Sequence, residues 1–278
     1  EILHADGTRS ERACDILVGA DGIHSALRQQ FYPDEGAPRW NGMMMWRGTT
    51  LARPFLDGRT MVQAGHRRAK FVVYPIEPVR PDGLQRINWI CDRRLREDGF
   101  GGGLTAPSRE DWSKPGSLDD LLPTFGSWRF AWLDVPGLIR AAEQILEWPM
   151  VDRDPLPRWR HGHTTLLGDA AHPMYPIGSN GATQAILDAA ALADALDGHA
   201  SITAALNAYE AARLPMTRDI VAMNRREGLD AILDMVEEAA PEGFARIEDV
   251  TDPTVLAEWV QAYKKAAGHQ VARPQAAH

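Results

Sequence analysis

TTLLGDAAHPMYPIGSNGATQAILD, residues 164–188, is the stretch of sequence that decides the fold. Residues 164–167 have the short apolar composition of a buried strand, which ends at Gly168. A loop rich in Pro and Gly follows over 173–181, and the alanine-rich segment 182–196 is predicted to be a helix. A buried strand, a glycine turn and a helix in this order are typical of an α/β fold.

The turn and the start of the helix have the residue types of a site for a polyhydroxylated, anionic ligand. Gly168 lets a ligand run close to the backbone, and an ionised Asp169 can accept hydrogen bonds from sugar-like hydroxyls. The helix that begins near Gly181 directs free N–H groups and a positive dipole end at whatever precedes it. Gly178 and Asn180 suit the positive φ values that such a turn needs. An ordinary strand–loop–helix connection remains the alternative at this point.

The composition excludes several other classes of protein. The 278 residues are 44% hydrophobic and 24% charged, which is ordinary for a globular chain and argues against disorder. With 30 basic against 38 acidic residues the net charge is −8, so no nucleic-acid partner is expected. No apolar run reaches the roughly 18 to 20 residues that cross a bilayer, and the N-terminus does not resemble a signal peptide, so no membrane partner is expected.

Cysteine and histidine usage argues against disulfides and metal. Cys14 and Cys91 are the only two cysteines, which favours a reducing compartment and a cytoplasmic location. No metal site is predicted, because no spacing for a fourth ligand is recognisable around the candidate ligands. His172 is expected to hydrogen-bond the loop backbone instead. The candidates are His161, His163, Asp169 and His172.

The N-terminal half alternates between strand and turn patterns. Residues 1–18 are predicted to form a hairpin, with strands at 2–4 and 13–18 around Asp6-Gly7. A glycine turn at 19–22 and a helix over 23–31 follow. Strand-like runs with no helical pattern between them predict an antiparallel sheet. These runs are 43–50, 60–64, 69–76 and 85–92.

The rest of the chain is predicted to be largely helical. Helices are expected over 118–125 and 135–144, with a strand at 145–151 between them and the quoted stretch. Residues 201–240 are predicted to be mostly helical, with a kink or break at Pro215, and 254–266 to be a final amphipathic helix. The arginines of the first of these helical regions are interpreted as a solvated face, with steering of an anionic nicotinamide cofactor as the alternative. They are Arg213, Arg218, Arg225 and Arg226.

Two motifs resemble those of a known family. GDAAHPMYPIGSNGATQAILDA, residues 168–189, resembles the second FAD-binding motif (the GD motif) of the class A flavoprotein aromatic hydroxylases. DILVGADGIHSALR, residues 15–28, resembles their DG motif, which is associated with FAD and NAD(P)H binding. The motifs occur in the family's order with a sheet region between them, and the resemblance covers at least residues 1–225.

Shorter stretches resemble the phenazine-modifying branch of that family. They are WRGTT at 46–50, FLDGRTMV at 55–62, YPI at 74–76 and ILEWPMVDRDPLPRW at 145–159.

The sequence differs from the family in one respect. The family begins with a strand and a G-x-G-x-x-G turn that cradles the FAD pyrophosphate, and this sequence contains no such motif. We therefore expect the chain to be a fragment that lacks about one domain of N-terminal sequence.

The resemblance implies an α/β fold class, with an incomplete Rossmann-like FAD-binding domain, an antiparallel-sheet substrate domain and C-terminal helices. The expected domains are 1–40 (FAD-binding, with the DG motif), 41–150 (substrate sheet), 151–200 (FAD-binding, with the GD motif) and 201–278 (helical). The expected assembly is left open, with a homodimer as one form.

The resemblance also implies a function. The chain is expected to belong to an FAD-dependent monooxygenase that consumes NAD(P)H and O₂ and hydroxylates an electron-rich aromatic substrate through a flavin C4a-hydroperoxide. That substrate would resemble a phenazine carboxylate or a hydroxybenzoate. A halogenase or prenyl-lipid reductase is disfavoured, since the halogenase motif W-x-W-x-I-P is absent. A second alternative is a flavin-free fragment that binds an aromatic ligand or a partner protein.

The resemblance assigns roles to residues of both motifs. Asp169 would hold the ribityl chain, backbone N–H groups around 178–181 would face the flavin N1–C2=O edge, and Pro176 would line the edge where the chemistry occurs. Asp21 and Gly22 would support the cofactor and the approach of the nicotinamide, and Arg28 would add positive charge. The cofactor set is Asp21, Gly22, Arg28, Gly168, Asp169, Pro176, Gly178, Ser179, Asn180, Gly181 and Ala182, with Pro176 as the catalytic candidate.

The substrate is expected between the flavin and the antiparallel sheet. Arg47 could pair with a substrate carboxylate in bidentate fashion, and a solvated charge on the sheet is its alternative. For Met45 and Tyr74 the alternative is ordinary packing. The substrate set is Met45, Arg47, Tyr74 and Ile76.

Overall fold

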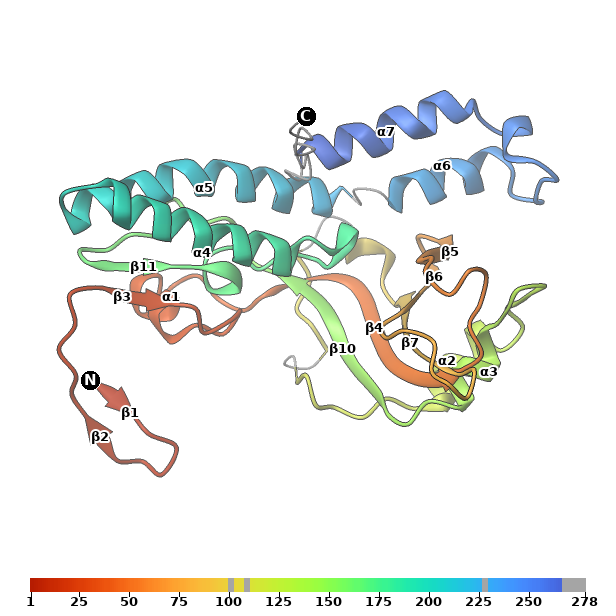
Figure 1. Cartoon of the computed structure of the whole chain (residues 1–278), viewed down its shortest axis with the longest axis horizontal. Helices are drawn as coiled ribbons and strands as arrows, with labels where there is room; N and C mark the ends of the chain where they lie inside the picture. Colours follow the sequence, from red (N-terminus) through yellow and green to blue (C-terminus); the bar gives the residue numbers. More distant parts are fainter. Residues whose placement is uncertain (100–102, 108–110, 227–229, 267–278) are drawn as a thin grey trace. The chain divides into compact units, whose positions relative to one another are not determined.

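The computed structural model describes residues 1–99, 103–107, 111–226 and 230–266, and it divides into two compact units. Unit 1 consists of Glu1–Ala37 and Asp152–Met223, and unit 2 of Pro38–Val151 and Asn224–His278. Each unit therefore combines segments that lie far apart in the sequence (Figure 1). In the described part of the chain, no helix is both long and apolar enough to cross a membrane.

Unit 1 is built around two parallel strands and two long helices. Strand β3 (Leu17–Gly19) pairs in parallel with β11 (Thr164–Leu166), so the DG motif contains one of two neighbouring strands and the GD motif begins just after the other. Helix α1 (Ala26–Phe31) follows β3. After β11 come two short 3-10 turns, η2 (Gly168–Ala170) and η3 (Ile177–Ser179), and then the helices α4 (Gly181–Gly198) and α5 (Ile202–Arg225).

The predicted N-terminal hairpin is shorter than expected. Strand β1 (Ile2–Leu3) pairs with β2 (Arg9–Ser10), and the prediction of a second hairpin strand at 13–18 was wrong. The turn closes early because Asp6 accepts hydrogen bonds from the backbone N–H and the hydroxyl of Thr8. The residues of β3 are thereby left to pair with β11 instead.

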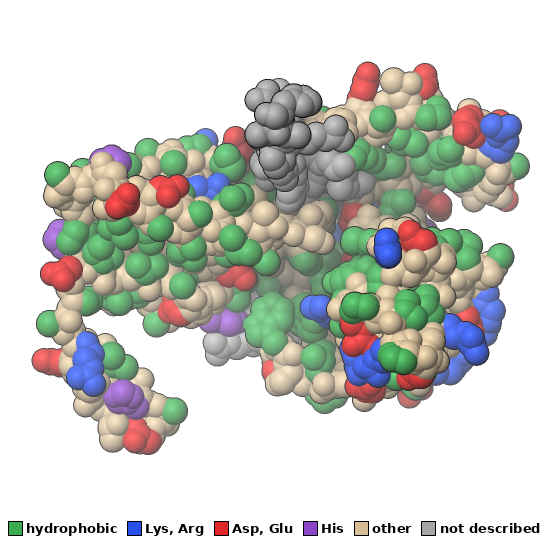
Figure 2. All heavy atoms as spheres, viewed as in Figure 1, with side chains coloured by type: hydrophobic (Ala, Val, Ile, Leu, Met, Phe, Trp, Pro, Cys, Tyr) green, Lys and Arg blue, Asp and Glu red, His purple; other side chains and the backbone are tan. Residues whose placement is uncertain are grey.

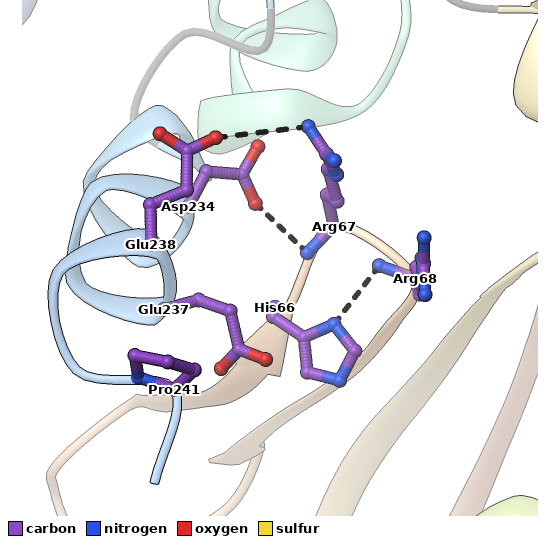
Figure 3. A pocket seen from close by; sticks show the side chains of 7 residues that line it. All are labelled: His66, Arg67, Arg68, Asp234, Glu237, Glu238 and Pro241. Atoms are coloured by element: carbon purple, nitrogen blue, oxygen red, sulfur yellow. Dashed lines mark hydrogen bonds and ion pairs between the residues drawn. The ribbon is translucent and has the colours of Figure 1, made fainter. Parts of the chain in front are cut away.

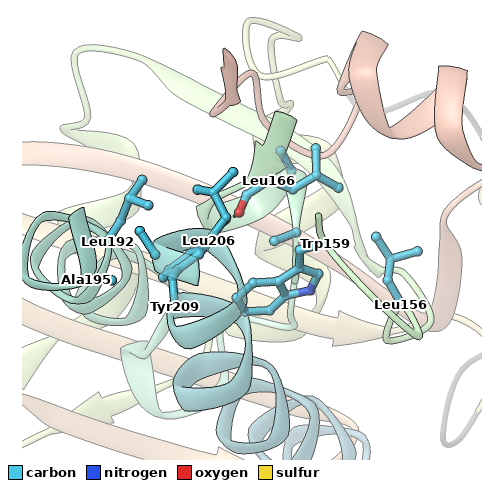
Figure 4. Packing of buried hydrophobic residues seen from close by; sticks show 10 residues of the cluster. Leu156, Trp159, Leu166, Leu192, Ala195, Leu206 and Tyr209 are labelled. Carbon is cyan, nitrogen blue, oxygen red and sulfur yellow. Dashed lines mark hydrogen bonds between the residues drawn. The ribbon is translucent and has the colours of Figure 1, made fainter. Parts of the chain in front are cut away.

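The core of unit 1 lies where α4 and α5 pack against β11. Trp159 is almost fully buried there, and its ring centroid lies 5.6 Å from that of Tyr209. The Tyr209 hydroxyl donates a hydrogen bond to the Leu166 carbonyl at 3.1 Å, which ties α5 to the end of β11. Figure 4 shows these side chains with their neighbours in the cluster, Leu156, Leu192, Ala195 and Leu206.

Helix α5 continues through Pro215, so the predicted kink or break does not interrupt it. Proline removes the hydrogen bond to the carbonyl four residues earlier, which here belongs to Ala211. Both Pro215 and Ala211 are exposed, so water can satisfy that carbonyl.

Some apolar side chains of unit 1 remain at the surface. Leu17 and Val18 of β3 and Ile186 of α4 are all exposed, and hydrophobic side chains are visible over this part of the molecule in Figure 2. Parallel strands are usually covered on both faces, so the exposure of β3 is unusual.

Unit 2 contains a five-stranded sheet in the order β10-β4-β7-β6-β5. Its strands are β4 (Arg39–Ala52), β5 (Val62–His66), β6 (Ala69–Pro75), β7 (Gln85–Arg94) and β10 (Ile145–Asp152). The pairs β4–β7, β7–β6 and β6–β5 are antiparallel, which confirms the predicted antiparallel sheet.

The helices of unit 2 are short, apart from the last. They are α2 (Leu118–Phe125), α3 (Val135–Arg140), α6 (Ala231–Ala239) and α7 (Pro253–Ala266). Small two-residue strands, β8 (Arg129–Phe130) and β9 (Leu133–Asp134), pair between α2 and α3. Helix α2 matches its predicted range, whereas α3 ends four residues earlier than predicted.

One face of the sheet is closed by α2 and α3. The Thr50 hydroxyl of β4 donates to the Leu138 carbonyl of α3 at 2.7 Å, and Phe71 of β6 packs against Phe125 of α2. Gly48 belongs to the same face, since it lies opposite Trp89 in the β4–β7 register. A Cβ atom at Gly48 would lie 2.3 Å from Trp89 Cζ2.

The Gly48–Trp89 contact predicts a stability effect. Gly48→Ala should lower the free energy of unfolding by about 1–3 kcal/mol, because the buried Trp89 ring must move to admit the methyl group. Gly198→Ala is the control, since no atom lies within 4 Å of a Cβ at the end of α4. Urea denaturation of both variants measures the difference, and equal stabilities would contradict the packing described here.

Candidate functional site

The GD motif forms a tight turn at the end of β11. Gly168 has φ +59°, a left-handed conformation that suits glycine. Its carbonyl accepts hydrogen bonds from the N–H groups of Ala171 (2.8 Å) and His172 (2.9 Å). A Cβ atom at Gly168 would lie 3.2 Å from the Ala185 Cβ of α4. The turn therefore lies against α4 with little room for a side chain.

Asp169 lies beside the start of α4. Its side chain is exposed, and a Cβ built at Gly181 would lie 4.0 Å from Asp169 Oδ1. Nearby protein atoms partly desolvate the carboxyl and raise its pKa, while His172 opposes that shift. The carboxyl group is thus available to an external hydrogen-bond donor next to the N-terminus of an 18-residue helix.

The loop before α4 contains two consecutive left-handed residues. Gly178 has φ 72° as predicted, and Ser179 has φ 57°. The prediction of a positive φ at Asn180 was wrong, because its φ is −86° and it occupies the N-cap position of α4. No side-chain cap is made there, so the first N–H groups of the helix, from Gly181 onward, lack a side-chain acceptor at that position.

The DG motif caps helix α1. The Asp21 carboxylate accepts a 2.8 Å hydrogen bond from the Ala26 N–H, and the Ser25 hydroxyl accepts one from the Arg28 N–H at 3.1 Å. Gly22 has φ 80°, and its carbonyl accepts the Ser25 N–H. These hydrogen bonds satisfy N–H groups in the first turn of α1 and fix where the helix begins, while Asp21 itself remains exposed.

Arg28 is buried and joins the two motifs. Its guanidinium donates to both oxygens of Glu35, to the carbonyls of Ala170 (3.2 Å) and Ala171 (2.9 Å), and to the carbonyl of Asp154 (2.8 Å). Five N–H donors are all that a guanidinium has. Arg28 therefore has no donor left for a direct bond to a cofactor, and its contacts hold α1 against the GD turn.

The predicted substrate residues lie on unit 2. The register places Met45 and Arg47 of β4 and Tyr74 of β6 on one face of the sheet, opposite to the face closed by α2 and α3. Met45 is buried, Arg47 is exposed and Tyr74 is half-buried. Ile76 follows the end of β6 and is exposed.

Asn88 of β7 is a polar neighbour on this face that the sequence did not suggest. Its Oδ1 accepts a 2.6 Å hydrogen bond from Arg47 Nε, and its register partners are Thr49 and Tyr74. An Asn within a strand has no sequence signature that separates a structural from a functional role. Only the pairing of β4 with β7 places it beside Arg47.

A network behind the GD turn was also missed. Asp188 of α4 is buried and binds the Gly168 N–H, His172 and Arg213 of α5. Arg213 is 5% exposed, so its interpretation as part of a solvated face was wrong. The His172 side chain binds the Asp188 carboxylate rather than the loop backbone. The available signal was the presence of two ionisable residues, His172 in the loop and Asp188 in the helix, within a largely apolar stretch.

Two further polar clusters have structural explanations. His161 stacks on Phe31 with centroids 4.0 Å apart. Within the described ranges, no group of three or more His, Cys, Asp and Glu side chains could hold a metal ion.

A pocket of about 250 Å³ lies between the β5–β6 turn and α6 (Figure 3). There the Arg67 N–H donates to Asp234 at 3.0 Å, and its guanidinium lies 3.9 Å from Glu238.

Comparisons with known proteins agree with these features. A family model described as an FAD binding domain matches residues 136–224. The phenazine 1,6-dicarboxylic acid hydroxylase of Lysobacter antibioticus is 48% identical over 211 residues, which are 75% of this chain and 50% of the relative. A 3-amino-4-hydroxybenzoate 2-monooxygenase of Streptomyces platensis is 37% identical over 232 residues, 82% of this chain and 53% of the relative.

Solved structures show the same fold. A salicylate hydroxylase in a substrate complex aligns with TM-score 0.65 and 23% identity, covering 98% of this chain and 67% of that one. Klebsiella pneumoniae HpxO in complex with FAD and uric acid aligns with TM-score 0.61 and 23% identity, over 95% of this chain and 58% of that one.

The chain spans about half the length of the curated relatives that it matches. The resemblance to the phenazine-modifying branch agrees with the similarity to the Lysobacter enzyme. Over the part that it spans, the chain is a relative of the class A FAD-dependent aromatic hydroxylases.

Proposed function

We propose that this chain supplies FAD- and substrate-binding parts of a monooxygenase that consumes NAD(P)H and O₂ and hydroxylates a carboxylated aromatic compound. The observation that carries the proposal is the GD turn, where an exposed Asp169 lies next to the N-terminus of α4. The two free cysteines support a reducing, cytoplasmic location.

The residues of the turn fit a flavin dinucleotide. Gly168 has no room for a side chain, so the backbone stays open to a closely bound ligand. Asp169 would accept hydrogen bonds from ribityl hydroxyls, and backbone N–H groups around Gly178 to Gly181 would face the electron-rich edge of the ring. The Ser179 N–H is not among them, because it donates to the Pro176 carbonyl at 3.2 Å. When bound, the flavin would accept hydride from NAD(P)H and activate O₂ for transfer of one oxygen atom to the substrate.

Other residues of unit 1 would shape the surroundings of the ring. Pro176 is exposed with φ −73° and ends the rigid segment before η3, which suits a wall beside the reacting edge. Asp21 and Gly22 would support the approach of the nicotinamide from the start of α1. Arg28 would act on the cofactor only through the backbone segments that it holds in place.

The substrate side of the proposal rests on Arg47. Its Nε is held by Asn88, whereas its Nη groups have no protein partner among the described residues. A guanidinium that is anchored in this way presents a planar fork to a carboxylate. The relatives support this chemistry, because those named for phenazine 1,6-dicarboxylic acid and 3-amino-4-hydroxybenzoate act on aromatic rings that carry carboxyl groups.

Cofactor binding is tested by mixing the purified chain with FAD and removing free flavin. We expect a retained flavin with a perturbed visible spectrum. Asp169→Ala should raise the dissociation constant for FAD at least about tenfold, since a charged acceptor is lost. Asp194→Asn, an exposed change on the outer part of α4, is the control. Normal flavin retention by Asp169→Ala would show that Asp169 does not bind the cofactor. A wild-type chain that binds phenazines but retains no flavin would favour the flavin-free alternative.

Substrate recognition is tested by titrating the chain with phenazine-1-carboxylate and with uncharged phenazine. Arg47→Met should weaken binding of the carboxylate about tenfold and leave binding of phenazine unchanged, because only the charged pair is lost. Arg53→Met, at an exposed arginine just after β4, is the matched control. An equal effect on both ligands would show that Arg47 contributes packing rather than charge recognition.

A further inference from the structure

A buried polar network lies directly behind the GD turn, within unit 1. Asp188 Oδ2 accepts the Gly168 N–H at 3.0 Å and lies 2.5 Å from His172 Nε2. Asp188 Oδ1 accepts a 2.7 Å hydrogen bond from Arg213 Nε, and Arg213 Nη2 donates to Gln184 Oε1 at 2.6 Å. All four residues of this network are at most 5% exposed. It connects the turn, α4 and α5.

The Asp188 carboxylate is the centre of the network. Burial desolvates it and would raise its pKa, but the hydrogen bonds from His172, Arg213 and Gly168 outweigh that effect and lower the pKa. The group is therefore ionised at neutral pH and forms a charge pair with Arg213. Gly168 and His172 bind Oδ2 and Arg213 binds Oδ1, so the loss of either oxygen leaves a buried donor without an acceptor.

His172 contacts Asp188 through Nε2. Its Nδ1 is buried and has no hydrogen-bond partner within the described part of the chain, so a proton there would be an unsatisfied buried donor. A proton on Nε2 instead reaches Asp188. The imidazole ring also packs against Trp159, with centroids 5.4 Å apart, which fixes its orientation.

The peptide groups around Gly168 are held from both sides. Its N–H is bound by Asp188, and its carbonyl by the N–H groups of Ala171 and His172. The left-handed φ of +59° requires this support, since glycine in solution visits many other conformations. Asp169 is the next residue, so the direction of its carboxyl group follows from the orientation of the Gly168 peptide.

We propose that Asp188 is a positioning residue, supported by His172 and Arg213, that fixes the Gly168 turn and so presents Asp169 to the hydroxyl groups of the cofactor. Asp188 is fully buried and does not itself contact the ligand. The inference rests on the proposed function for the identity of the cofactor, whereas the role in the turn is a property of the chain alone.

Asp188→Asn tests the inference. An amide has one acceptor oxygen, so it can serve Arg213 or Gly168 but not both. In the apo chain labelled with ¹⁵N-glycine, we expect hydrogen exchange at the Gly168 amide to become at least about tenfold faster. The dissociation constant for FAD should rise about tenfold or more, with an unchanged circular dichroism spectrum. Asp194→Asn on the same helix should change neither quantity.

His172→Phe provides a second variant. It keeps the ring against Trp159 and removes only one of the three donors, so the Gly168–Asp188 bond remains. Its FAD affinity should fall between those of the wild type and Asp188→Asn. If Asp188→Asn does not fold, unchanged FAD affinity in His172→Phe overturns the inference.

The two readouts separate this inference from the proposed function. Faster exchange at Gly168 with unchanged FAD affinity would overturn the positioning role and leave the proposed function in place. Unchanged exchange in Asp188→Asn would show that the carboxylate does not hold the turn. A wild-type chain that binds no FAD would contradict FAD binding by this chain alone, and hydrogen exchange at Gly168 would still test whether Asp188 holds the turn.

Discussion

The passage of the chain from β11 to α4 is constrained by the left-handed backbone at Gly168. At that point the strand must end, the chain must reverse, and Ala185 leaves little space on one side. Glycine alone meets both demands without strain, because any other residue would add a Cβ at 3.2 Å from Ala185 in an unfavourable φ region. The placement of Asp169 and the packing of α4 on the strand both follow from this turn.

Arg28 provides the second constraint on unit 1. Three of its five hydrogen bonds join a helix that begins at residue 26 to backbone carbonyls at residues 154, 170 and 171. A buried guanidinium is costly unless every donor finds an acceptor, so the three segments must come together for the charge to be tolerated. Glu35 supplies the opposite charge, and Arg153 also contacts it at 3.2 Å. The two motifs therefore behave as one structural unit.

Local sequence patterns predicted the features that depend on local physics. The strand–turn–helix order around Gly168, the antiparallel sheet and the range of α2 were read from periodicity and turn residues. The features that were missed depend on tertiary contacts: β3 pairs with a strand about 145 residues away, and the burial of Arg213 is settled by Asp188 on another helix. The pairing of Arg47 with Asn88 likewise exists only in the register of β4 and β7.

The two faces of the five-stranded sheet of unit 2 differ in how closely their side chains are packed. Gly48, Thr50 and Trp89 are interlocked with each other and with α3 on one face, where almost any substitution disturbs the packing. Arg47 and Tyr74 alternate with them and belong to the other face. Adjacent positions along the same strand therefore meet different physical requirements. A change of charge at the exposed Arg47 does not enter the packing around Trp89, so this position of β4 can vary at little cost in the free energy of unfolding.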